Sequence, residues 1–258
     1  QNIANTSTSK KPLRNLREDS GINPDGLPAR ILRKCVGVLA LPIIVLIRLI
    51  VASSIWPQDW KLHWLYPLYK RKAKSSANNY RGIHLTTQLS KVAERILCNP
   101  LLPYLDAVGA YGKRQFAYRN HHGYRDALAC MVFSWIWALG LGKRVALYCS
   151  DVSGAFDRVN ASRLIQKLRA AGVHDLLLDV LKNWLDIREA TVCVDGHFSH
   201  QFPLSNMVFQ GTVLGPPLWN CFFADASRAI SQHGFTDIAF ADDLNCFKIF
   251  DKTIGNDY

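Results

Sequence analysis

The sequence predicts an α+β fold, and two observations lead to it. Stretches with apolar residues at helical spacing alternate along the chain with short apolar runs, and tight-turn residues join some of these runs into antiparallel hairpins. The chain has 258 residues, of which 49% are hydrophobic. This is enough to bury a sizeable core, either as one large domain or as two lobes in contact.

Helical spacing is clearest in the second half of the chain. Apolar residues recur at this spacing from Gly123 to Leu139, from Leu164 to Leu168 and from Leu178 to Leu185. Gly172 separates the last two stretches, because glycine commonly ends a helix. The pair Pro216–Pro217 is predicted to open a further helix, since proline is favoured in a first turn.

Three regions have strand character. The stretch from Trp64 to Tyr69 is apolar, and the basic run that follows it returns through Tyr80 and Arg81, which predicts a hairpin with cations at its tip. The residues KRVALYCSD predict a short buried strand that ends at Asp151. The pair Asp195–Gly196 indicates the turn of another hairpin.

The N-terminal part contains a polar stretch and a long apolar one. The first 20 residues carry four Lys or Arg among Asn, Thr and Ser, and we expect a flexible lead-in without a signal peptide. The apolar stretch from Val36 to Trp56 is interrupted by Pro42 and Arg48, so we expect a buried helix. A membrane-spanning helix is the alternative.

The positive charge is concentrated in the first 100 residues. The chain has a formal charge of +11, and residues 1–100 hold 16 Lys or Arg against 5 Asp or Glu. The remaining residues hold 15 of each. This asymmetry indicates that the first part holds a polyanion, whereas a solvated surface or a targeting tail is the alternative.

The cysteines point to no zinc module and no disulfide framework. The seven cysteines form no CxxC pair and no close Cys/His cluster. We therefore expect an intracellular protein in a reducing compartment.

Two adjacent acids stand in an apolar stretch, FTDIAFADDLNCF, and they suggest chemistry. Asp242 and Asp243 must be compensated there, because burying unpaired carboxylates is costly. A solvated turn is one explanation and a divalent metal is the other. Asp151 supplies a third carboxylate at the end of a predicted strand. Two Mg²⁺ ions bridged by such acids would suit phosphoryl or nucleotidyl transfer.

The strings DVSGAFD, QGTVLGPPL and FADD occur in this order and resemble the central motifs of reverse transcriptases, most closely those of non-LTR (LINE-like) retrotransposons. The segments INPDGLPARIL, WKLHWLYPLYKRK, NNYRGIHLTTQLSKVAERIL and QFAYRNHHGYRDAL are similar to the same family, so the resemblance covers about residues 20–250. It implies the fingers and palm of a right-hand polymerase, with an antiparallel palm sheet backed by helices.

The resemblance also implies residue roles. Asp151 and Asp242 would be the principal acids and metal ligands, Asp243 a further one, and Val152 part of the metal site, with Mg²⁺ or Mn²⁺ as the cofactor. The residues implied to contact the nucleotide or template are Lys70, Arg81, Gly154, Ala155, Phe156, Gln210 and Gly211. Phe156 would lie at the sugar and exclude a 2′-hydroxyl, although it could also be plain core. Asp157 would be structural.

The sequence departs from the family pattern in three places. Phe209 stands where Pro is common before the Gln-Gly pair, and Gly82 replaces the Pro that usually follows Arg81, so we expect less rigid loops. The chain ends fifteen residues after Asp243. We therefore expect a lead-in at 1–20, mainly fingers over about 21–125 and mainly palm over about 126–258, with the thumb and an endonuclease region missing.

The implied function is RNA-directed DNA polymerisation, with an RNA template, a DNA primer and dNTPs as partners, no membrane, and a location in the cytoplasm and nucleus. Two alternatives stay open. The chain could be an incompetent nucleic-acid-binding remnant, or a maturase-like polymerase domain that serves RNA splicing. Template-dependent incorporation of dNTPs would separate the first reading from the remnant, and intron-specific binding would indicate a maturase.

Overall fold

The computed structural model describes residues 6–21 and 23–251 and contains two compact units, each built from two separate parts of the chain. The first unit comprises residues 1–104 and 156–215, and the second comprises residues 105–155 and 216–258. This division is interleaved in the sequence. The expected assignment of mainly fingers to about 21–125 and mainly palm to about 126–258 stays a prediction. Two predicted segments are described only in part. Residues 1–5 of the predicted lead-in and residues 252–258 of the predicted palm lie outside the described residues.

The first unit contains most of the helices. They are α1 (Thr6–Arg14), α2 (Ala29–Lys34), α3 (Val36–Ser53), α4 (Gln88–Ala107, of which residues up to 104 belong here), α6 (Ala161–Ala170) and α7 (Asp175–Leu185), with short 3₁₀ turns at Gln58–Lys61, Ala77–Asn79 and Phe156–Arg158. Gly172 separates α6 from α7 as predicted, and its φ of +83° requires a glycine there. The buried faces of α6 and α7 carry leucines at helical spacing.

The sheet of the first unit has the strand order β2-β1-β4-β5, and β6 also pairs with β4. Its strands are β1 (Leu62–Tyr69), β2 (Tyr80–Leu85), β4 (Arg188–Val194), β5 (His197–Phe198) and β6 (Phe202–Leu204). Strands β1 and β4 are parallel, and the other pairs are antiparallel. The two predicted hairpins, β1–β2 and β4–β5, are confirmed. In the second, Asp195 and Gly196 both have positive φ, as a two-residue hairpin turn requires.

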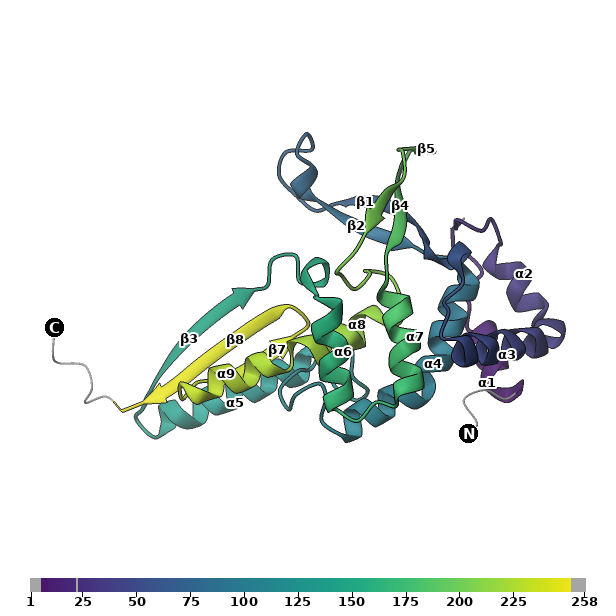
Figure 1. The fold of residues 1–258 in the computed structure, drawn as a ribbon. Helices are drawn as coiled ribbons and strands as arrows, with labels where there is room; N and C mark the ends of the chain where they lie inside the picture. Colours follow the sequence, from purple (N-terminus) through teal and green to yellow (C-terminus); the bar gives the residue numbers. More distant parts are fainter. Residues whose placement is uncertain (1–5, 22, 252–258) are drawn as a thin grey trace. The chain divides into compact units, whose positions relative to one another are not determined.

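The second unit is a three-stranded antiparallel sheet with helices against it (Figure 1). Its strands β3 (Arg144–Asp151), β8 (Asp243–Phe250) and β7 (Thr236–Phe240) follow the order β3-β8-β7. Its helices are α5 (Tyr124–Gly140), α9 (Asp225–Gln232) and, from Pro216 on, α8 (Gly215–Phe223). The core between α5 and the sheet consists of Ala127, Met131, Ile238 and Phe247.

The strand before Asp151 differs from the prediction, because most of β3 is exposed. Tyr148 is 64% exposed and Leu147 is 47% exposed. The physical reason is position: β3 is an edge strand that pairs only with β8 among the described strands. Cys149 is also exposed. Because side chains alternate along a strand, Cys149 shares a face with Asp151, two residues on.

The N-terminal region also differs from the prediction. Helix α1 lies within the segment expected to be a flexible lead-in, and Leu13 and Leu16 are buried there. Helix α3 packs on α1, α2 and α7. Among the described residues these contacts cover one of its faces, and Val38 and Leu41 on the other are 76% and 61% exposed. By length and composition alone, α3 could cross a membrane.

Candidate nucleotidyl-transfer site

The three predicted acids lie at one end of the sheet of the second unit. Asp151 is the last residue of β3 and stands directly opposite Asp243, the first residue of β8. Asp242 belongs to the two-residue turn between β7 and β8, and its carbonyl oxygen accepts a hydrogen bond from the Val152 amide at 3.2 Å. The antiparallel pairing of β3 with β8 therefore places Asp151 and Val152 beside Asp242 and Asp243, although 91 positions separate Asp151 from Asp242.

The turn that carries the acids is fixed by a buried glutamine that the sequence reasoning missed. Ala241 has a φ of +58°, an unfavourable conformation for a residue with a Cβ. The Gln115 side chain compensates by bonding both of its backbone groups: Oε1 accepts from the Ala241 amide at 2.9 Å, and Nε2 donates to its carbonyl oxygen at 3.1 Å. That oxygen also accepts from Trp219 Nε1 at 3.1 Å.

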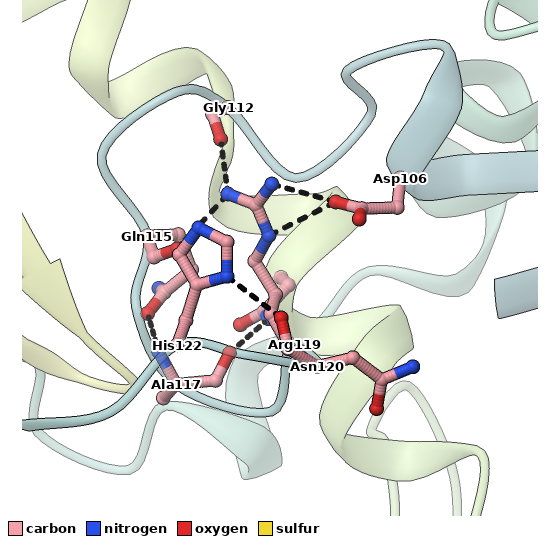
Figure 2. A network of polar contacts seen from close by, with 8 residues as sticks. Asp106, Gly112, Gln115, Ala117, Arg119, Asn120 and His122 are labelled. Atoms are coloured by element: carbon pink, nitrogen blue, oxygen red, sulfur yellow. Dashed lines mark hydrogen bonds and ion pairs between the residues drawn. The ribbon is translucent and has the colours of Figure 1, made fainter. Parts of the chain in front are cut away.

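The loop that supplies Gln115 is itself held by Arg119 (Figure 2). The guanidinium contacts Asp106 through Nε at 3.0 Å and Nη2 at 2.6 Å. Its Nη1 donates to the carbonyl oxygens of Gly112 and Gln115, both at 3.2 Å. Gln115 Oε1 also accepts from the Ala117 amide. A continuous set of polar contacts therefore runs from Asp106 through Arg119 and Gln115 to the acid turn.

The segment after Asp151 is a tight turn with small residues. The Ala155 amide donates to the Val152 carbonyl oxygen at 3.2 Å, and Gly154 has a φ of +63°. Glycine is the residue that adopts this conformation without strain. Gly154 is exposed whereas Ala155 is only 4% exposed.

The carboxylate oxygens at this end of the sheet are the type of ligand that a hard divalent cation binds. Like charges directly opposite each other in a sheet destabilise it, so the Asp151–Asp243 pair would be relieved by a bound cation. Carboxylates are the ligands that Mg²⁺ prefers. Within residues 6–21 and 23–251, however, no three or more His, Cys, Asp or Glu side chains are close enough to form a ready-made metal group. The assignment of Asp151, Val152, Asp242 and Asp243 to a metal site stays a prediction.

The other predicted contact residues belong to the first unit. Lys70 follows β1 directly, its amide donates to the Asn79 carbonyl oxygen at 2.9 Å, and its side chain is exposed at the hairpin tip with Arg71, Lys72 and Lys74. Arg81 pairs with Leu68 across the β1–β2 ladder and is also exposed. The hairpin therefore presents its cations to solvent as predicted.

Asp157 is linked electrostatically to this hairpin. Partial burial raises the pKa of Asp157, and the positive charge of Lys70 acts in the opposite direction. Phe156, the residue before it, is 7% exposed, and its carbonyl oxygen accepts from the Val208 amide at 2.9 Å. The backbone of DVSGAFD thus contacts the segment that leads into Gln210.

The Gln210–Gly211 loop lies against β2. The Gln210 carbonyl oxygen accepts a hydrogen bond from the His84 amide at 3.1 Å. Gly211 has a φ of +93°, and a Cβ there would lie 2.7 Å from the His84 carbonyl oxygen, so no other residue fits without a shift.

Phe209 was expected to leave this loop less rigid, but its ring is completely buried. It packs edge-on against His63, His84 and Trp184, with ring centroids 4.9, 5.8 and 5.4 Å away. The ring therefore anchors the loop through packing, where a proline would have restricted the backbone. Gly82 lies within the β1–β2 ladder opposite Pro67, which likewise restrains it.

A cross-strand pair of acids in an antiparallel sheet and a basic hairpin are both features found in nucleic-acid polymerase domains. The comparisons with known proteins agree with this class. Residues 70–252 match the family described as reverse transcriptase (RNA-dependent DNA polymerase), and the chain belongs to this family.

Its relatives include polymerases of non-LTR elements. The chain is 33% identical over 171 residues to the RNA-directed DNA polymerase from mobile element jockey of Drosophila melanogaster. This match covers 66% of the chain and 19% of that protein. It is 28% identical over 198 residues to the probable RNA-directed DNA polymerase from transposon X-element of the same species, covering 76% of the chain and 22% of the relative. The chain thus spans about a fifth of these relatives' length.

Solved structures agree on the fold. A chain of the partial Cas6-RT-Cas1--Cas2 complex superimposes with a TM-score of 0.51 and 19% identity, covering 95% of the present chain and 37% of that chain. A chain of the Cas6-RT-Cas1--Cas2 complex superimposes with the same TM-score, and the match covers 23% of that chain. The mixed α+β fold is therefore that of a reverse transcriptase.

Proposed function

We propose that this chain is the polymerase domain of a non-LTR retrotransposon and copies RNA into DNA. The observation that carries the proposal is the register of β3 and β8, which pairs Asp151 with Asp243 beside the Asp242 turn in a chain of the reverse transcriptase family. In the reaction, the 3′-hydroxyl of a DNA primer attacks the α-phosphorus of a dNTP. A new phosphodiester bond forms, the bond to the β-phosphate breaks, and pyrophosphate leaves.

The acids would hold the cations of the site. Asp151 and Asp242 would be the main ligands, with Asp243 and Val152 beside them. Bound Mg²⁺ would activate the attacking oxygen and neutralise charge on the leaving phosphate. Gln115 would keep Asp242 and Asp243 in place through the backbone of Ala241, so that the carboxylates need not reorganise when the cation binds.

The remaining residues would bind the nucleotide and the template. Gly154 and Ala155 would offer backbone amides to the triphosphate, because small residues let phosphate approach the chain closely. Lys70 and Arg81 would contact phosphate oxygens, Lys70 as a point charge and Arg81 through two donors. Gln210 and Gly211 would lie at the paired bases.

Phe156 would select the sugar. An aromatic ring beneath the ribose leaves no room for a 2′-hydroxyl and offers it no hydrogen bond. The ring is 7% exposed, so this role needs a nucleotide to pack on the small part that reaches the surface.

The test is primer extension on an RNA template with Mg²⁺ and labelled dNTPs. Asp151→Asn and Asp242→Asn should each remove incorporation, whereas Asp195→Asn should not, because Asp195 is an exposed turn residue with positive φ that asparagine tolerates. Binding of RNA without any incorporation by the unaltered chain would instead identify a non-catalytic remnant, and selective binding of an intron would identify a maturase.

A further inference from the structure

We propose that two buried anchors, Glu94 at one end and the linked His84, His63 and Arg188 at the other, position the Gln210–Gly211 loop, so that it discriminates the matched dNTP from mismatched ones. This role rests on the proposed function. All four residues belong to the first unit, and each is at most 3% exposed. None of them is expected to touch substrate, so they are positioning residues.

Glu94 fixes the C-terminal part of the loop. Its Oε2 accepts hydrogen bonds from the amides of Val213 and Leu214, at 2.7 and 3.0 Å, although 119 or more positions separate them in the chain. Its Oε1 accepts from the Ser90 hydroxyl at 3.2 Å, one turn earlier in α4. A completely buried carboxylate is costly unless it is bonded in this way, so the arrangement strongly favours one loop conformation.

The loop is closed on itself between these anchors. The Thr212 hydroxyl donates to the Phe209 carbonyl oxygen at 2.7 Å and accepts from the Gly215 amide at 3.1 Å. A Cβ at Gly215 would lie 2.6 Å from that same carbonyl oxygen. The turn from Phe209 to Gly215 is therefore too tight to relax locally, and movement at Glu94 would be transmitted to Gln210 and Gly211.

His84 fixes the N-terminal part. Its amide bonds the Gln210 carbonyl oxygen, its own carbonyl oxygen faces Gly211, and its ring Nδ1 lies 2.9 Å from Nδ1 of His63. His63 Nε2 in turn lies 2.9 Å from Arg188 Nη1. The backbone contact with the loop is thus continued by a chain of side-chain contacts into the core.

Arg188 ends the chain of contacts that begins at His84. Its guanidinium donates to the carbonyl oxygens of Trp184 and Trp60, and its centre lies 4.5 Å from the Phe209 ring centroid. Burial lowers the pKa of Arg188 to about 10, and the charge of Glu94 partly offsets this effect. The guanidinium remains charged at neutral pH, and Glu94 is the carboxylate that acts on it electrostatically.

Glu94→Gln is the primary test, because it keeps the shape of the side chain and removes its charge. Glu189→Gln is the matched control, since Glu189 is exposed on β4 of the same unit. Amide hydrogen exchange reads the loop directly. At Val213 and Leu214 it should become about ten- to a hundredfold faster in Glu94→Gln, the range implied by a lost charge-assisted hydrogen bond, and stay unchanged in Glu189→Gln.

The second readout is dNTP affinity on an RNA template with a DNA primer, for matched and mismatched bases. Glu94→Gln should weaken binding of the matched dNTP about tenfold and of the mismatched dNTP far less, so the discrimination ratio falls. Ser90→Ala, which removes only the contact to Oε1, should give a smaller loss in the same direction. An unchanged ratio, or exchange that does not respond, would overturn the inference.

The two levels of failure can be told apart. If the unaltered chain binds no dNTP on the template and primer, the proposed function fails and the positioning role fails with it. Hydrogen exchange needs no nucleotide, so it would still report whether Glu94 holds the loop. If dNTP binding is normal but insensitive to Glu94, only the positioning role is wrong.

Discussion

At the scale of single residues, Gln115 carries the acid turn, and its removal should be costly. Gln115→Leu leaves the amide of Ala241 buried without this partner, at a residue that already has positive φ. We expect a loss of about 1 to 3 kcal/mol in the free energy of unfolding. Denaturant unfolding measures it. Gln232→Leu, at an exposed position at the end of α9, should cost much less, and equal costs would contradict the role of Gln115.

The two buried histidines make stability depend on pH. Burial, followed by the charge of Arg188, lowers the pKa of His84 from 6.5 to about 4, and the same causes lower the pKa of His63 well below its ordinary value. The groups that face them are each other, Arg188 and Lys91. Because the folded chain takes up these protons only at lower pH than the unfolded chain, their contribution is complete above about pH 6.5.

Stability should therefore fall as the pH drops from 6.5 toward 4, by on the order of 3 kcal/mol for His84. The free energy of unfolding, measured across this range, checks the prediction. His84→Asn should reduce the dependence, since asparagine does not titrate, and the part due to His63 should remain. His197→Asn, at an exposed position in β5, should leave it unchanged. A flat profile in the unaltered chain would refute the assignment.

The sequence identified residues of the candidate site unevenly. Asp151, Asp242 and Asp243 could be found because acids are conspicuous in apolar strands and their strings resemble a known family. Gln115 and Glu94 could not, because their importance lies in bonds to the backbone of residues more than 100 positions away. The one available signal was a glutamate among the apolar residues of α4.

At the scale of elements, the β1–β2 hairpin should bind nucleic acid through phosphates. Lys70→Ala and Lys74→Ala should each weaken RNA binding and reduce the slope of log affinity against log salt by about one, because each contact releases roughly one counterion. Lys182→Ala, exposed on α7, is the control for a lost charge elsewhere in the unit. Binding assays at several salt concentrations decide it, and unaltered slopes in both hairpin variants would exclude phosphate contacts there.

The Gln210–Gly211 loop should not tolerate a side chain at Gly211. Gly211→Ala places a Cβ against the His84 carbonyl oxygen at positive φ, and we expect a loss of about 2 kcal/mol or more. Gly37→Ala tests the opposite case, because Gly37 lies in α3 with open space around it. It should stabilise by about 0.5 to 1 kcal/mol. Thermal unfolding of both variants provides the comparison.

Elements with a strong local signal could be predicted from the sequence, and those decided by distant partners could not. The hairpin turn at Asp195–Gly196 and the helix of α5 follow from local preference. The exposure of β3 depends on its place at the sheet edge, and the burial of Leu13 in α1 depends on packing with α3. Apolar composition alone could not show that the described part of the chain leaves one face of α3 exposed.

At the scale of the whole molecule, each compact unit needs two separate chain segments, which predicts how a shortened chain behaves. Residues 1–215 contain the whole of the first unit but lack β7 and β8. Strand β3 would then lose its partner, so residues 105–155 should become sensitive to protease while the helices of the first unit stay protected. Limited proteolysis with mass spectrometry tests this. Equal protection of both regions would show that the units do not fold separately.

The exposed thiol of Cys149 turns the sheet edge into a place for a reporter. It lies on the same face of β3 as Asp151, whereas Cys98, Cys221 and Cys246 are buried and should react slowly. A small fluorophore attached there would sense a cation or nucleotide arriving at the acids by a change in its emission. Cys130, exposed on α5, and the half-buried Cys35 and Cys193 would be replaced by serine so that the signal comes from one site. The chain thus carries its own labelling position for following ligand binding in real time.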